Sequence, residues 1–157
     1  MKKLSMVLTG IIFFFSFSMA VAADKKEYPV SPMEKIAKKW RIAYYEGGEY
    51  NEYQQMLSLI LSSLSELGWI EPFKIPDQEN DKDTDKIWAW ISANAKSRYL
   101  EFVSDAHYSS NWKKDLREQN RQLILKRIKE KQDIDLIIAM GTWAGQDLAN
   151  NEHFVPT

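Results

Sequence analysis

Residues suited to binding a small molecule occur at three points of the chain, each directly after a run that is expected to form a strand. Paired glycines let a ligand approach the backbone closely, and free N–H groups at the start of a helix favour an anionic group such as a carboxylate. Tyrosine and tryptophan offer flat walls, while aspartate, threonine and glutamine can fix orientation by hydrogen bonds. The candidate ligand-binding residues are Tyr45, Glu46, Gly47, Gly48 and Tyr50, then Asp105 and Tyr108, then Gly141, Thr142, Trp143 and Gln146.

Each kind of candidate also has a purely structural interpretation. Gly47–Gly48 and Gly141 fit the simple ends of strands equally well. Tyr45 follows another tyrosine on the same strand, so that one of the two is expected to be core. Asp105 fits a solvated strand end, and Trp143 fits a side chain that packs its helix against a sheet. The pattern therefore predicts a binding region and leaves the role of each residue open.

The sequence favours binding over catalysis. It has no cysteine and only two histidines, His107 and His153, so thiolate chemistry is excluded and imidazole ligands are few. It lacks the glycine-rich phosphate-binding motifs and the Gly-x-Ser-x-Gly elbow of hydrolases. A net charge of −1 gives no electrostatic reason to expect nucleic acid as a partner. We therefore expect no enzymatic activity, no cofactor and no metal site.

The alternation of expected strands and helices predicts an α/β fold, a parallel sheet with flanking helices. Apolar runs predict strands at 41–45, 99–103 and 135–140, the last of which is typical of the middle of such a sheet. Ligands bind beyond the carboxyl ends of such strands. The acidic stretch 77–85 is expected to be a solvated loop. Apolar spacing and cap residues, Thr142 among them, predict helices at 31–39, 51–67, 85–96, 112–131 and 143–150.

The first 23 residues have the layout of a cleavable signal peptide. Lys2 and Lys3 precede an apolar run from Met6 to Phe15, and small residues follow at 20–23. A membrane-spanning helix needs about 20 apolar residues, which is more than this run supplies. We expect export to the periplasm with no stable membrane anchor after cleavage, and an N-terminal extension over 24–39 that contains the short helix predicted at 31–39.

Four segments occur in an order that resembles a known protein family. They are 41–48, which reads Arg-Ile-Ala-Tyr-Tyr-Glu-Gly-Gly, then 66–71 and 102–109, and finally 135–147. The Met-Gly-Thr-Trp-Ala-Gly-Gln stretch of the last is the most distinctive. Together these segments are similar to the periplasmic substrate-binding components of an uncharacterised class of bacterial ABC transporters.

The resemblance implies a two-lobed α/β protein, similar to the type I periplasmic binding fold, that closes on a small solute, often amino-acid-like. The implied partners are that solute, a permease contacted directly, and the ATPase that drives it. Family members are more than twice as long, so 40–157 is expected to be the N-terminal lobe of an incomplete fold whose second lobe is absent. The alternative is a free-standing exported α/β domain that binds a protein partner or acts in signalling without transport.

Overall fold

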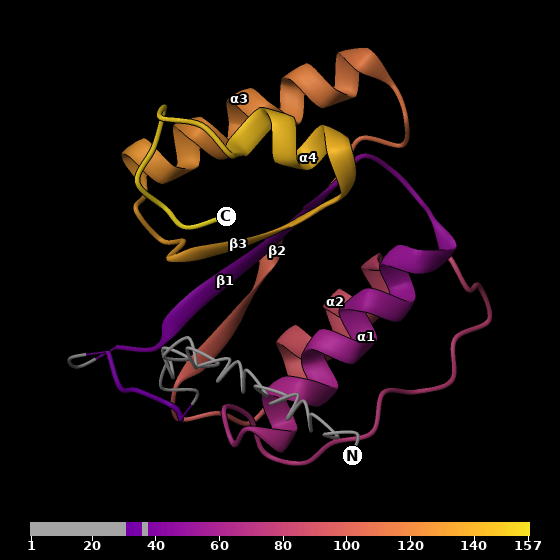
Figure 1. Ribbon diagram of the computed structural model, residues 1–157, viewed down its shortest axis with the longest axis vertical. Coiled ribbons are helices and arrows are strands. Elements are labelled where there is room, and N and C mark those ends of the chain that lie inside the picture. The colour runs from indigo at the N-terminus through magenta and orange to yellow at the C-terminus, as the bar shows by residue number, and fades with distance from the viewer. Residues whose placement is uncertain (1–30, 36–37) are drawn as a thin grey trace, which may run out of the picture.

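The computed structural model describes residues 31–35 and 38–157, and the predicted signal peptide lies outside them (Figure 1). The described chain forms an α/β fold, as expected, with a parallel sheet and flanking helices. The strands are β1 (Trp40–Glu46), β2 (Leu100–Ser109) and β3 (Leu136–Met140). The helices are α1 (Asn51–Glu66), α2 (Asp85–Asn94), α3 (Lys114–Glu130) and α4 (Gly141–Leu148).

The order of strands in the sheet is β2-β1-β3, and both pairings are parallel. The prediction that 135–140 lies in the middle is therefore wrong for the described sheet, in which β1 is central and β3 lies at an edge. The run is apolar because both of its faces are covered. Ile138 and Met140 pack in the cluster of α1 and α2, while Ile137 packs in the cluster of α3 and α4.

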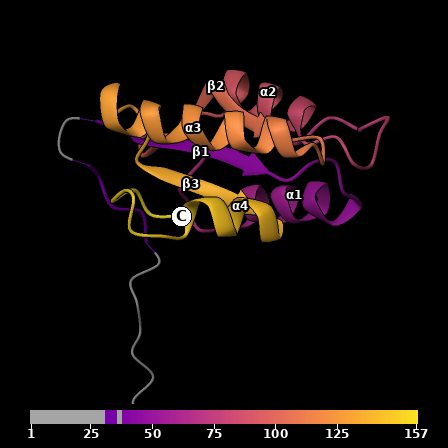
Figure 2. The ribbon, with the colours of Figure 1, turned by 90° about the horizontal axis from the view of Figure 1, so that it is seen from above.

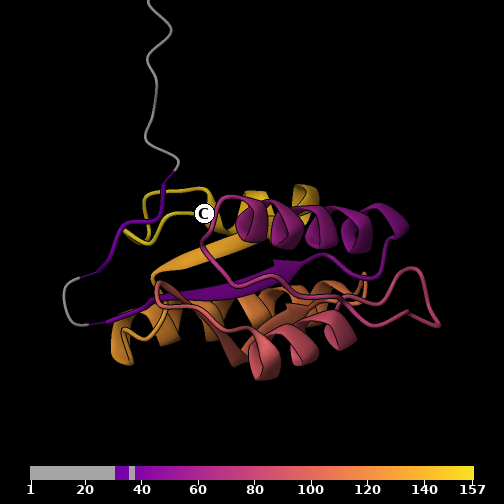
Figure 3. The ribbon, with the colours of Figure 1, turned by 90° about the horizontal axis from the view of Figure 1, so that it is seen from below.

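The fold has three layers, with α3 and α4 on one face of the sheet and α1 and α2 on the other (Figure 1). Figure 2, seen from above the view of Figure 1, looks onto the face covered by α3 and α4. Figure 3, seen from below, looks onto the face covered by α1 and α2. Side chains of β1 alternate between the two cores. Ile42 and Tyr44 pack towards α1 and α2, and Ala43 and Tyr45 pack towards α3 and α4.

The described residues of the segment before β1, 31–35 and 38–39, do not form the helix predicted there. These described residues contain an antiparallel bridge between Lys35 and Lys38 and no helical turn. Tertiary contacts outweigh the local helix signals here. The Trp40 indole donates a hydrogen bond to the Met33 carbonyl (3.1 Å), and Lys35 forms an ion pair with Asp135 (2.5 Å).

Strand β2 is longer than the predicted strand 99–103 because it contains a bulge. Ile42 pairs with Phe102 and Tyr44 pairs with His107, so β2 carries three extra residues between these two pairs. The extra backbone is bonded from both faces. The Trp88 indole donates to the Val103 carbonyl and Arg127 Nη1 donates to the Asp105 carbonyl, each at 3.0 Å.

Candidate functional site

The loops that follow the strands meet at the carboxyl edge of the sheet. The backbone N–H groups of Ser110 and Trp112 donate to the carbonyls of Glu46 (3.2 Å) and Gly47 (2.8 Å). The Trp112 indole N–H also donates to the Glu49 carbonyl (3.0 Å). These three hydrogen bonds fix the loop after β2 to the loop after β1.

Trp112 adopts an unusual backbone conformation within this loop. The helix predicted over 112–131 begins at Lys114, so Trp112 precedes it, with a φ of 57° in the left-handed region. This conformation costs a residue with a Cβ about 1–2 kcal/mol. Its side chain is nevertheless 48% exposed. A strained residue that holds a large apolar side chain in solvent is typical of a functional site.

Four aromatic side chains form a continuous group at this edge, which we call the edge cluster: Tyr50, Tyr53, Trp112 and Trp143. The ring centroids of Tyr50 and Tyr53 lie 5.1 Å apart, those of Tyr53 and Trp112 6.4 Å, and those of Trp112 and Trp143 5.6 Å. The Arg117 guanidinium lies 4.8 Å from the Trp143 ring. Sequence patterns missed Tyr53 and Trp112 because both fit the apolar side of a predicted helix.

Glycines make room for the edge cluster. A Cβ on Gly48 would lie 2.7 Å from the Trp112 indole, and the φ of Gly48 is 153°. Gly141 has a φ of 81°, and a Cβ there would clash with the Tyr53 hydroxyl. These glycines were expected to let a ligand approach the backbone closely. In the structure, the aromatic side chains of Trp112 and Tyr53 occupy that space instead. A ligand that contacts the cluster would meet rings rather than bare backbone at these positions.

Glu46 ends the central strand as a buried carboxylate. Its Oε2 atom accepts hydrogen bonds from the hydroxyls of Tyr44 and Thr84, both at 2.8 Å. Burial raises the pKa of Glu46, because no cation among the described residues pairs with it and only hydroxyls oppose the effect. The Thr84 hydroxyl also lies 2.9 Å from His107 Nε2, which extends the network. Thr84 is itself buried, so the acidic loop 77–85 is anchored at its end rather than solvated throughout.

Three predicted site residues lie away from the edge cluster. Tyr45 is fully buried and its hydroxyl donates to Asp147 (2.8 Å) on the face covered by α3 and α4. Asp105 and Tyr108 lie within β2, not in a loop after it, because the bulge continues the strand to Ser109. Both contact Arg127 of α3, through an ion pair of 2.6 Å to Asp105 and a hydrogen bond of 3.2 Å to the Tyr108 hydroxyl.

Residues at the start of α4 lie beside the edge cluster. Trp143 belongs to the cluster, and Gln146 Oε1 accepts a hydrogen bond from Arg117 (3.1 Å). Arg117 also pairs with the buried Asp147 (2.7 Å). Thr142 is exposed and is not the N-cap that was predicted, since the cap position falls on Met140 without a side-chain hydrogen bond.

Comparison with family models, curated proteins and solved structures found no match for this chain. In the described part of the chain, no helix is long and apolar enough to cross a membrane. Residues 31–35 and 38–157 also contain no group of three histidine or acidic side chains that could hold a metal ion. The possible role of the edge cluster therefore rests on its own geometry and on the sequence.

Proposed function

We propose that this chain captures a small organic solute at the carboxyl edge of its sheet, as the periplasmic binding component of an ABC-type importer. The observation that carries the proposal is Trp112, which is held half-exposed in a left-handed conformation by hydrogen bonds to the loop after β1. The signal-peptide pattern supports export. The four segments that resemble periplasmic binding components support transport and a type I lobe.

The edge cluster suits a solute with a flat or apolar part. The exposed rings of Tyr50 and Trp112 provide large contact areas with few rotatable bonds. Their positions are set when the chain folds, so little further ordering opposes binding. In the proposed transport cycle, the solute-loaded form contacts the permease directly.

A solute screen with tryptophan variants tests capture at this edge. We expect one or more amino acids or related small organic solutes to raise the melting temperature of the whole chain. Trp112→Ala and Trp143→Ala should each weaken that binding by about tenfold or more. Trp90→Ala is the matched control, because Trp90 lies on α2 and packs against Phe73 (5.8 Å). Trp88 is unsuitable as a control because it is 1% exposed and belongs to the core.

Two results would contradict the proposal. A flat response across the whole panel would argue against solute capture, and an equal loss in Trp90→Ala would place binding elsewhere. Export is tested separately by cell fractionation. A shortened chain in the periplasmic fraction is expected, whereas full-length chain retained in the cytoplasm would contradict export.

A further inference from the structure

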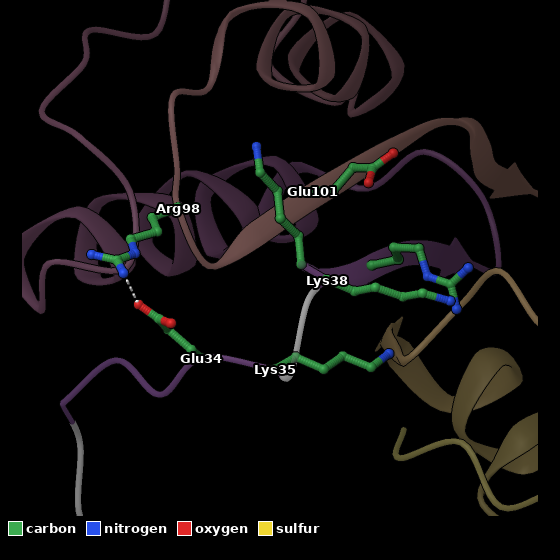
Figure 4. Close-up of a pocket in the computed structure, with 7 residues that line it drawn as sticks. Glu34, Lys35, Lys38, Arg98 and Glu101 are labelled. Carbon is green, nitrogen blue, oxygen red and sulfur yellow. Dashed lines mark ion pairs between the residues drawn. The ribbon is translucent and has the colours of Figure 1, made fainter.

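We infer that the chain has a second binding site, a basic pocket at the amino ends of β1 and β2 that takes a phosphate monoester. The cavity has a volume of about 600 Å³. Its positively charged lining residues are Lys35, Lys38, Lys39, Arg41 and Arg98. Figure 4 shows Arg98 paired with Glu34 on one side of the opening, with Lys35 and Lys38 extending from the segment that precedes β1.

The pocket carries positive charge that its own acidic residues do not balance. Glu34 and Glu101 line it, and Asp135 borders it through ion pairs to two of its cations. Five cations against these three carboxylates leave two unbalanced positive charges. The whole chain has a net charge of −1, so this surplus is local. Concave basic surfaces concentrate anions because their walls focus the electrostatic field.

Two of the cations are held in place. Asp135 accepts hydrogen bonds from Lys35 Nζ (2.5 Å) and from Arg41 Nε (3.0 Å) and Nη2 (3.2 Å). The Lys35 ammonium also lies 5.1 Å from the centroid of the Trp40 ring. Since these contacts fix both head groups before a ligand arrives, an anion that binds them need not order two flexible side chains.

The remaining charge comes from side chains that are free to bind. Lys38 and Lys39 are exposed, and neither forms an ion pair within the described chain. One surplus charge arises because Lys35 and Arg41 share the Asp135 carboxylate. The other arises because Lys38 and Lys39 are set against the single carboxylate of Glu101. A phosphate monoester carries close to two negative charges above its second pKa of about 6, and it offers three acceptor oxygens. A phosphodiester or a single carboxylate would neutralise only half of the surplus.

This site is independent of the proposed solute capture. The basic pocket lies where β1 and β2 begin, whereas the edge cluster lies where these strands end, and the two share no residue. A phosphate monoester can come from a soluble metabolite or from a lipid headgroup. The chemistry at the pocket is the same for both sources, so an experiment needs one arm for each.

Calorimetric titration of the whole chain with glycerol 3-phosphate tests the soluble source. Flotation with phosphatidylcholine vesicles, with and without phosphatidic acid, tests the headgroup. We expect binding in at least one arm, and it should strengthen as the pH rises from about 5 to about 8, because the second phosphate proton is lost. Lys38→Gln with Lys39→Gln should weaken it by about tenfold or more, since each lost contact is charge-assisted.

The matched control is Lys74→Gln with Lys82→Gln, which removes two exposed lysines outside the pocket. It should bind as the parent does. Binding in the vesicle arm alone identifies a headgroup, and binding of glycerol 3-phosphate identifies a soluble ester. No binding in either arm, equal loss in the control, or equal affinity for a phosphodiester would overturn the inference.

Discussion

The imidazole ring of His107 stacks on the phenol ring of Tyr44, with centroids 5.0 Å apart and planes within 5° of parallel. The stack places the imidazole beside the Thr84 hydroxyl, which also bonds the buried Glu46 carboxylate. His107 Nδ1 faces the exposed Asp85 at 3.5 Å. A buried acid and a half-buried base are thus joined through one threonine, and each gives the stability of the fold its own dependence on pH.

His107 should make the fold less stable in mild acid. Burial lowers its pKa below the ordinary 6.5, although Asp85 and Asp83 oppose this effect. Between the lowered pKa of His107 in the folded chain and about 6.5 in the unfolded chain, the unfolded chain binds more protons. The free energy of unfolding is therefore at its full value above about pH 6.5 and falls as the pH drops through that interval. His107→Gln should reduce this loss in urea unfolding at a series of pH values. An unaltered profile in His107→Gln would contradict the assignment.

Glu46 should act in the opposite direction. Burial raises its pKa above 4.5, so the folded chain holds this proton to higher pH than the unfolded chain does. Stability is therefore lost as the pH rises from 4.5 through the folded pKa. Glu46→Gln should gain stability relative to the parent chain over that rise, as measured by urea unfolding. The exposed Glu66→Gln is the control, and a difference that is constant with pH would refute the prediction.

Arg127 should contribute far more to the stability of the fold than an arginine at the surface does. It is buried, and it bonds the Asp105 carbonyl in the bulge as well as the carboxylates of Asp105 and Asp133. Arg127→Met should cost about 2–3 kcal/mol of unfolding free energy, because these acceptors lose a charged donor. Arg121→Met breaks the more exposed pair with Glu152 and should cost less than about 1 kcal/mol. Similar losses in the two variants would show that Arg127 does not hold the bulge.

Two glycines of α4 should respond differently to alanine. Gly141→Ala places a Cβ against the Tyr53 hydroxyl at a φ of 81°, which should destabilise the fold by about 1–3 kcal/mol. Gly145 has open space around it, so Gly145→Ala should stabilise the helix by up to about 1 kcal/mol. Thermal and urea unfolding measure both changes. Equal effects would mean that Tyr53 moves away from Gly141 without cost.

The strain at Trp112 should be separable from its proposed role in binding. Trp112→Gly and Trp112→Ala both remove the indole and should weaken solute binding equally. Only glycine relieves the left-handed backbone, so the glycine variant should be more stable than the alanine variant by about 1 kcal/mol. Urea unfolding compares the two variants. If alanine is as stable as glycine, the backbone of this loop has relaxed and is not strained in the parent.

Much of the fold could be predicted from the sequence because its signals are local. The apolar spacing along α1 and the alternation of strands and helices gave the elements and the parallel sheet. Position within the sheet could not be predicted in this way. An edge strand covered on both faces, such as β3, is as apolar as a central one.

The candidate site was predicted less completely. The glycines and Trp143 stand at the strand ends where ligands bind in parallel sheets, and the structure brings Tyr50, Gly48, Gly141 and Trp143 together. The bulge in β2 is held by Trp88 and Arg127, which are distant in sequence, so no local pattern could show that Asp105 and Tyr108 are strand residues. Trp112 was missed because its spacing fits the apolar side of the helix predicted over 112–131, whereas the helix begins at Lys114 and leaves Trp112 in the loop.

The bulge in β2 also decides which face of the sheet each later side chain of the strand points to. Successive strand residues point to opposite faces, and the three extra residues are an odd number. Phe102 and His107, five positions apart, therefore share the face of Tyr44, which an unbroken strand would not allow. Deleting one residue from 103–106 would turn His107 towards α3 and Tyr108 towards α2. We expect this short stretch to accept substitutions at the exposed Ser104 but to be intolerant of changes in length, because its residue count decides which face of the sheet each later residue of β2 meets.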